Sequence, residues 1–256
     1  MQTENELLHL SDTDRRQTDK ISRKMTNRSS LLNEAADDLL IEVEMNRVVA
    51  LVDMDCFYVQ VEQKLQPHYK GKPCAVAQYK KWKGGGLIAV GYEARAFGVT
   101  RNMMGDDARK KCPGLHLFRV PELRGKADLT KYRDAGAEVI TVLSTFSQCV
   151  ERASVDEAYI DLTEEVDRII QQAGKIKVTD LQNTYIVGND GKGENGVEDW
   201  LTSVYDGQEF GEANQRLAVG AKIAEDMRAA VYRETGYRCS AGIGHNKVRV
   251  VYLTQS

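Results

Sequence analysis

The sequence predicts an α+β fold in which two long helices cover one antiparallel sheet. Three observations support this prediction. An apolar run at residues 48–52 shows no alternation, as expected of a central strand buried on both faces. Two stretches, beginning near residues 128 and 217, place apolar side chains at three- and four-residue steps, the period of an amphipathic helix. Shorter apolar runs at 149–153, 158–162 and 238–243 indicate further strands.

With residues 57–127 set aside, the elements follow in the order strand, helix, strand, strand, helix, strand, which is that of the ferredoxin-like βαββαβ sandwich. A further helix is expected at 166–172. Residues 173–212 are rich in Gly, Asn and acids, and we expect a surface insertion there with one candidate strand at 185–187. Residues 1–46 are dominated by polar side chains and are expected to form a disordered extension.

Residues 57–127 are expected to form a lobe inserted between the first strand and the first long helix. The pattern predicts a helix at 57–65, which must stop before Pro67, and a second short helix at 106–111. Strands are expected at 74–78, 87–92 and 116–120, with a polar turn at 80–86.

Composition limits the class of protein. A chain of 256 residues with 42% hydrophobic residues can bury a core in one large or two small domains. No apolar run approaches the roughly 20 residues of a membrane span, and the N-terminus does not resemble a signal peptide, so we expect a soluble intracellular protein. Its five cysteines are widely spaced without a CxxC pattern, which indicates reduced, mostly buried thiols rather than disulfides or a zinc site.

The formal net charge of −3 conceals a strong segregation of charge. Residues 57–133 hold 16 Lys and Arg against 6 Asp and Glu, whereas residues 164–212 hold 4 against 11. A basic lobe within an acidic chain favours a polyanion bound at one place. The alternative is a solvated charged face, although such faces usually mix the two signs more evenly.

Two acidic pairs stand where predicted strands end or turn. Asp53 and Asp55 follow the first strand, and side chains two apart point the same way, so both could face one site with the Met54 carbonyl as a further hard oxygen ligand. Alternatively, the two aspartates only cap the following helix. The second pair, Asp156 and Glu157, lies in a predicted hairpin turn, where solvated acids are also common.

In a ferredoxin-like sheet the first strand lies beside the central hairpin, so the two acidic pairs are expected to meet at one end of the sheet. Carboxylates a few ångström apart cannot all stay ionised unless cations neutralise them. Two divalent ions about 3.5 to 4 Å apart meet that need and are the usual device for in-line displacement at phosphorus. The sequence therefore predicts a two-metal site of the magnesium type.

The motifs VDMDCFYVQVEQ, KPCAVAQYKKWKGGGLIAVGYEARAFGVTR and ERASVDEAYIDLT resemble those of the Y-family DNA polymerases, in the same order, over about residues 47–247. The resemblance implies a palm built from 47–56 and 128–247 and a small fingers domain at 57–127. It further implies a DNA-directed DNA polymerase that works in translesion synthesis in the nucleus, uses two Mg²⁺ ions or Mn²⁺ in their place, and binds primer-template DNA, damaged DNA and deoxynucleoside triphosphates (dNTPs).

The resemblance also assigns roles to individual residues. Asp53, Asp156 and Glu157 correspond to the catalytic metal ligands, together with the backbone carbonyl of Met54. Tyr58 corresponds to the steric gate against ribonucleotides, and Gln78 to a contact with the template base. The residues expected to bind the incoming nucleotide are Cys56, Phe57, Tyr58, Tyr92, Arg95, Arg101 and Lys247.

The chain departs from the family after residue 247. Where the family continues as VLAKLA into thumb and little finger domains, this sequence reads VRVVYLTQS, so both domains and the region that binds a sliding clamp are expected to be missing, and 248–256 to be an aberrant tail. Two other readings stay open. The chain could be a truncated, catalytically impaired isoform, or a two-metal nucleotide cyclase, although a cyclase has no use for a basic fingers lobe.

Overall fold

The computed structural model describes residues 45–172, 174–186, 196–206 and 211–247, and the backbone of the strand at 251–253. The chain divides into the units Met1–Met45 and Asn46–Ser256, and the fold described below is that of the second unit. The predicted disordered extension at 1–46 lies outside the described residues except for Met45 and Asn46. No helix among the described residues is long and apolar enough to cross a membrane.

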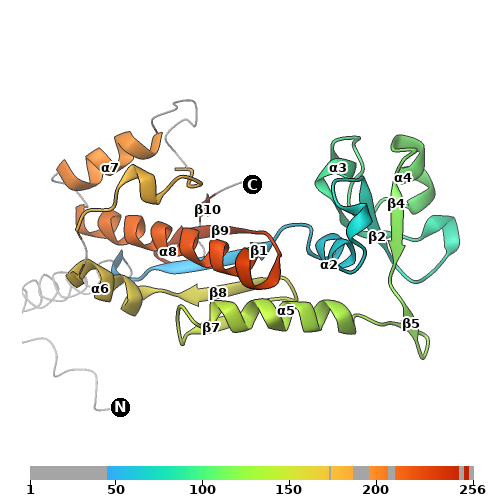
Figure 1. Cartoon of the computed structure of the whole chain (residues 1–256), viewed down its shortest axis with the longest axis horizontal. Coiled ribbons are helices and arrows are strands. Elements are labelled where there is room, and N and C mark those ends of the chain that lie inside the picture. The colour runs from blue at the N-terminus through green and yellow to red at the C-terminus, as the bar shows by residue number, and fades with distance from the viewer. Residues whose placement is uncertain (1–44, 173, 187–195, 207–210, 248–250, 254–256) are drawn as a thin grey trace, which may run out of the picture. The chain divides into compact units, whose positions relative to one another are not determined.

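The larger sheet has the strands β1 (Val49–Met54), β7 (Val150–Arg152), β8 (Glu157–Asp161), β9 (Cys239–Gly244) and β10 (Val251–Leu253). They lie in the order β10-β9-β1-β8-β7, and every neighbouring pair is antiparallel. The helices α5 (Thr130–Leu143) and α8 (Gly211–Thr235) pack against each other beside this sheet (Figure 1). The predicted βαββαβ order is thus confirmed, with β10 added at the edge within the segment that we expected to be an aberrant tail.

Among the described residues, the expected burial on both faces of β1 holds only at the start of the strand, where Val49 and Ala50, on opposite faces, are both buried. Val48 packs against Gly220 of α8, where a Cβ would come within 2.6 Å of the valine side chain, and glycine therefore allows close approach of helix and strand. Leu51 and Asp53 lie on the face opposite to Val48 and are half-buried. This open face of the sheet carries the candidate site.

The segment 173–212, which we expected to be a surface insertion, contains more regular structure than its composition suggested. It follows α6 (Thr163–Gln172) and contains the 3₁₀ turn η3 (Val178–Asp180) and the helix α7 (Gly196–Asp206), which packs against α8. The expected strand at 185–187 is absent at Tyr185 and Ile186, and residue 187 lies outside the described residues. Three of its described side chains are buried in the main apolar core: Ile176, Leu181 and Leu201.

The inserted lobe has a sheet of its own, with the strands β2 (Cys74–Ala77), β3 (Leu87–Val90) and β4 (His116–Arg119) in the order β3-β2-β4. Strand β2 runs antiparallel to β3 and parallel to β4. A second apolar core lies within this lobe. The division of the chain into palm and fingers stays a prediction. The other elements are α2 (Phe57–Leu65), η1 (Pro67–Tyr69), η2 (Trp82–Gly84), α3 (Tyr92–Arg95), α4 (Gly105–Lys111), β5 (Glu122–Leu123) and β6 (Lys126–Ala127).

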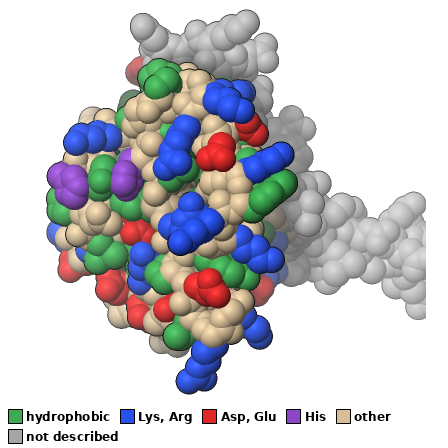
Figure 2. Space-filling model, turned by 90° about the vertical axis from the view of Figure 1, so that its right-hand side faces the viewer, with side chains coloured by type: hydrophobic (Ala, Val, Ile, Leu, Met, Phe, Trp, Pro, Cys, Tyr) green, Lys and Arg blue, Asp and Glu red, His purple; other side chains and the backbone are tan. Residues whose placement is uncertain are grey.

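Figure 2 views the molecule from the side of this lobe, and Lys and Arg side chains are spread over the face that it presents. The five cysteines are all free thiols, and Cys74, Cys112 and Cys239 are buried, as predicted.

Candidate active site

The first strand and the central hairpin bring the predicted carboxylates together. Asp53, near the end of β1, pairs directly with Glu157 at the start of β8. One residue further on, the Met54 N–H donates a 2.9 Å hydrogen bond to the backbone carbonyl of Asp156. Asp53 therefore meets two adjacent acidic residues that lie more than a hundred positions further along the chain.

This crowding has an electrostatic consequence. Burial, followed by the charges of Glu157, Asp156 and Asp55, raises the pKa of the Asp53 carboxyl from 3.8 to about 6. The positive charge of Arg95 lowers the pKa of Asp53 but does not cancel this rise. A bound cation would stabilise the ionised form of a carboxylate that lies next to other negative charges.

The side chains are not arranged as a finished metal cage. Among the described residues, no three Asp, Glu, His or Cys side chains converge closely enough to hold a metal ion as they stand. The Asp156 carboxylate instead accepts a 2.6 Å hydrogen bond from the Ser154 hydroxyl, which in turn accepts one from the Asp156 N–H. The donor set of carboxylate and carbonyl oxygens fits a hard divalent cation, provided that Asp156 exchanges its serine partner for the ion.

The Asp55 carboxylate lies near Asp53, as the sequence suggested, because its hydrogen-bond partner Ser240 pairs directly with Asp53 across β9 and β1. The Asp55 side chain is only 7% exposed, and one carboxylate oxygen accepts a 2.8 Å hydrogen bond from Ser240 on β9. The other oxygen is buried without a hydrogen-bond partner. The alternative that the aspartates cap helix α2 is wrong. The N-cap residue of α2 is Cys56, which has φ +38° and makes no side-chain capping hydrogen bond. Asp55 thus joins the ends of β1 and β9.

Helix α2 carries the next group of predicted residues. Phe57 is 2% exposed and packs edge-to-face on Tyr237 at 5.5 Å, so only its backbone could meet a nucleotide. Cys56 is half-buried, and burial raises the pKa of its thiol to about 12. Tyr58 is half-buried; burial and then the Asp156 charge raise its pKa, whereas Arg133 and Arg101 lower it. Tyr58 therefore lies next to the carboxylates.

Behind Tyr58 lies a buried polar cluster that the sequence reasoning missed. The rings of Tyr58 and Tyr132 stack with centroids 4.1 Å apart. The Tyr132 hydroxyl donates to Glu62, a carboxylate that is only 2% exposed, and Lys131 pairs with the same oxygen. Since Glu62 and Tyr132 are 70 residues apart, no local pattern in the sequence points to this contact.

Tyr92 and Arg95, predicted to bind the triphosphate, lie on the short helix α3. Tyr92 is 48% exposed, and the Arg95 guanidinium lies 5.0 Å from the centre of its ring. The Arg95 Nε donates a 3.0 Å hydrogen bond to the Val90 carbonyl. The positive charge of Arg95 opposes the rise in the pKa values of Asp53 and Cys56, which burial raises overall. Arg101 and Gln78 are exposed on the same inserted lobe.

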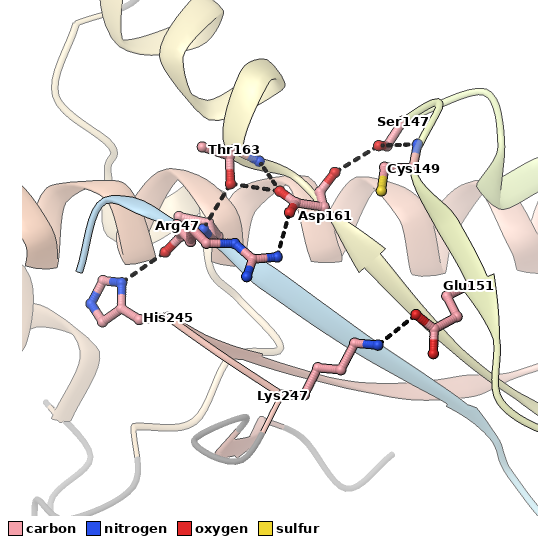
Figure 3. A network of polar contacts seen from close by, with 9 residues as sticks. Arg47, Ser147, Cys149, Glu151, Asp161, Thr163, His245 and Lys247 are labelled. Carbon is pink, nitrogen blue, oxygen red and sulfur yellow. Dashed lines mark hydrogen bonds and ion pairs between the residues drawn. The ribbon is translucent and has the colours of Figure 1, made fainter. Parts of the chain in front are cut away.

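Lys247 follows β9 and reaches across the open face of the sheet (Figure 3). Its Nζ lies 2.5 Å from a carboxylate oxygen of Glu151 on β7 and 4.9 Å from the centre of the Tyr159 ring. Tyr159 is two residues after Glu157 on β8, so it lies on the same face. The Lys247 ammonium group therefore lies beside Tyr159, two residues along β8 from Glu157.

Comparison with known proteins agrees with this fold. The model of the impB/mucB/samB family matches residues 52–249. The chain therefore belongs to this family, that of the Y-family DNA polymerases.

Its relatives include DNA polymerase eta of Drosophila melanogaster, 46% identical over 236 residues, which cover 85% of this chain and 27% of that protein. DNA polymerase eta of Arabidopsis thaliana is 45% identical, covering 79% of this chain and 30% of that protein. The chain thus spans less than a third of the length of these relatives. In fold it is similar to DinB from Sulfolobus solfataricus, with a TM-score of 0.52 and 24% identity over 79% of this chain and 43% of that one.

Proposed function

We propose that this chain is the palm and fingers part of a translesion DNA polymerase of the eta type. Its reaction would be template-directed transfer of a nucleotidyl group from a dNTP to a primer 3′-hydroxyl during bypass of damaged DNA. The relatives named DNA polymerase eta support this reading, and so does the basic inserted lobe, which suits a nucleic acid.

The observation that carries the proposal is the meeting of Asp53 with Asp156 and Glu157. The raised pKa of the Asp53 carboxyl reflects burial and then the negative charge of Glu157 and Asp156, a concentration of carboxylates that a polymerase needs for its metal ions and that a purely structural sheet end does not need. These three carboxylates and the Met54 carbonyl would hold two Mg²⁺ ions, or Mn²⁺ in their place. When bound, such ions activate the attacking hydroxyl and stabilise charge on the leaving pyrophosphate.

The remaining residues would place the nucleotide. Arg95, with its planar guanidinium, and Lys247, with its point charge, suit the triphosphate oxygens. To reach them, Lys247 would exchange its exposed partner Glu151 for a phosphate. Tyr58, beside the carboxylates and backed by the Tyr132 ring, stands where a sugar next to the metal site would meet it.

The contacts of the nucleic acid bases belong to the same proposal. Arg101 would stack over the incoming base, and Gln78 would touch the template base. We also propose the nucleus as the place of action, since the eta relatives are eukaryotic enzymes; a fluorescent fusion confined to the cytoplasm would contradict this. The resemblance assigns sliding-clamp binding to parts of the family's sequence outside this chain.

Primer extension tests the proposal. The unsubstituted chain, Asp53→Asn and the control Asp134→Asn, an exposed aspartate on α5, are given a labelled primer on an undamaged template and on one with a cross-linked pyrimidine pair. We expect Mg²⁺-dependent addition on both templates, unchanged in the control and lost in Asp53→Asn. Addition by Asp53→Asn at the normal rate would contradict the site. Nucleotide binding without addition by the unsubstituted chain would favour the impaired isoform, and cyclic nucleotide formation would favour the cyclase.

A further inference from the structure

One arginine of the inserted lobe has an arrangement of contacts that the proposed function does not use. Arg119, the last residue of β4, donates through Nη1 to the carbonyls of Gln78 at 2.9 Å and Lys80 at 3.1 Å. Its Nη2 donates to the carbonyl of Gly84 at 3.1 Å. A single guanidinium thus holds three carbonyls of the loop 78–86, which connects β2 to β3.

The side chains of this loop contribute little to holding it, whereas its backbone has two further contacts: the Gly105 N–H donates a 2.8 Å hydrogen bond to the Gly85 carbonyl, and Gly86 forms a β-bridge with Met104. Residues 80–83 are all exposed, and Trp82 is 70% exposed, so these side chains do not anchor the loop in either apolar core. Its backbone also turns through three successive residues with positive φ: Lys83 at +47°, Gly84 at +80° and Gly85 at +84°. A non-glycine residue in this region costs free energy, so the surrounding contacts must stabilise it.

The loop closes around the guanidinium without spare room. A Cβ at Gly85 would lie 2.8 Å from the Lys80 carbonyl oxygen and 3.0 Å from Arg119 Nη1. The Gln78 N–H donates to the Gly86 carbonyl at 2.9 Å, so with Arg119 both backbone polar groups of Gln78 are hydrogen-bonded. The backbone of Gln78 is therefore fixed, and only its side-chain torsions remain free.

We propose that Arg119 is a positioning residue, which holds loop 78–86 so that the exposed Gln78 side chain meets the template base at a fixed place. This inference rests on the proposed function for the role of Gln78, whereas the contacts of Arg119 with the loop do not depend on it.

The first measurement is trypsin cleavage after Lys80, Lys81 and Lys83, followed by mass spectrometry. Cleavage requires the loop to open, so its rate reports the open population. We expect Arg119→Gln to be cut about tenfold faster than the unsubstituted chain, because the hydrogen bonds to a charged donor are lost. Arg119→Lys should lie between them, since an ammonium cannot span three carbonyls as a planar fork does. Arg109→Gln, at an exposed arginine on α4, removes the same charge and should cleave at the normal rate.

The second measurement uses primer-template DNA with 2-aminopurine as the templating base, at low ionic strength, where binding is strongest. We expect the unsubstituted chain to change the aminopurine fluorescence, and Arg119→Gln to lose at least half of that change while binding the DNA equally by anisotropy. Gln78→Ala should lose the change as well. In the Gln78→Ala background Arg119→Gln should add nothing, since both act through one contact.

Gly85→Ala provides a second route that keeps the arginine in the sequence, because its methyl group would crowd both Arg119 Nη1 and the Lys80 carbonyl and so disturb their contact; it should reproduce both effects if Arg119→Gln fails to fold. Normal trypsin resistance in folded Arg119→Gln would overturn the proposal, and so would faster cleavage with a normal aminopurine signal. No aminopurine response from the unsubstituted chain would contradict the proposed function and with it the positioning role, while the trypsin result would still show whether Arg119 holds the loop.

Discussion

Asp53→Asn should make the metal-free protein more stable at neutral pH while it removes a metal ligand. The folded-state pKa of Asp53 is about 6 against 3.8 for an ordinary aspartate, so the folded protein binds this proton more tightly than the unfolded chain does. Stability therefore falls as the pH rises from about 4 to about 6 and levels off above, where ionisation is complete in both states. Asparagine cannot ionise, so it removes this loss.

The size of the effect follows from the shift. A difference of about 2 pKa units corresponds to at most about 3 kcal/mol. Because Asp53 is only half-buried and solvent screens its neighbours, we expect a gain of about 1 to 2 kcal/mol at pH 8. For a folded unit of about 200 residues this is a rise of roughly 2 to 8 °C in Tm. At pH 4 the variant and the unsubstituted chain should differ little.

Urea unfolding followed by circular dichroism, at pH values from 4 to 8 with EDTA present, measures this gain. Asp134→Asn serves as the control and should change stability at no pH. Millimolar Mg²⁺ should then stabilise the unsubstituted chain and not Asp53→Asn. A loss of stability in Asp53→Asn at pH 8, or a gain of equal size at pH 4, would refute the reasoning about the carboxylate cluster.

Three further substitutions test the residues around the carboxylates. Tyr58→Ala should lower the selectivity for dNTPs over ribonucleoside triphosphates, measured as the ratio of kcat/KM values; an unchanged ratio would make Tyr58 a packing residue. Tyr132→Phe keeps the ring but removes a hydrogen bond to the buried Glu62 carboxylate, so unfolding should become easier by about 1 to 3 kcal/mol in a denaturant titration, and a loss below about 0.5 kcal/mol would contradict this. Lys247→Met loses an exposed ion pair with Glu151 and the contact of its ammonium group with the Tyr159 ring, and should cost about 1 kcal/mol of stability or less, yet weaken binding of Mg²⁺-dNTP about tenfold by calorimetry; unchanged affinity would remove it from the triphosphate site.

The sequence predicted the main sheet and its two long helices because their patterns are strong and local. The period of α8 and the apolar run of β1 are visible without any tertiary information. Helix α7 was not predicted, because the acids and glycines of 173–212 indicated irregular structure although a helical period is present there. Val197, Trp200, Leu201 and Val204 stand at steps of three, four and seven residues, and they form the packed side of α7.

Prediction of the site was limited by what a sequence pattern can show. Two-residue spacing correctly suggested that Asp53 and Asp55 lie close together, but it could not show that Asp55 is buried and hydrogen-bonded to Ser240 on β9. Long-range polar contacts are likewise invisible in sequence. Neither Glu62 with Tyr132 nor Arg119 with its carbonyls follows any local pattern, because each pair is joined only by the fold.

The central claim is that Asp53, Asp156 and Glu157 hold two divalent ions together with a nucleotide, and counting Mn²⁺ ions tests it most directly. Free Mn²⁺ is measured by electron paramagnetic resonance during titration of the chain with dNTP present, against dNTP alone and against Asp53→Asn and Glu157→Gln. We predict two ions per chain and nucleotide in the unsubstituted protein, and fewer than two in each variant. An equal count in the unsubstituted chain and both variants would contradict the claim.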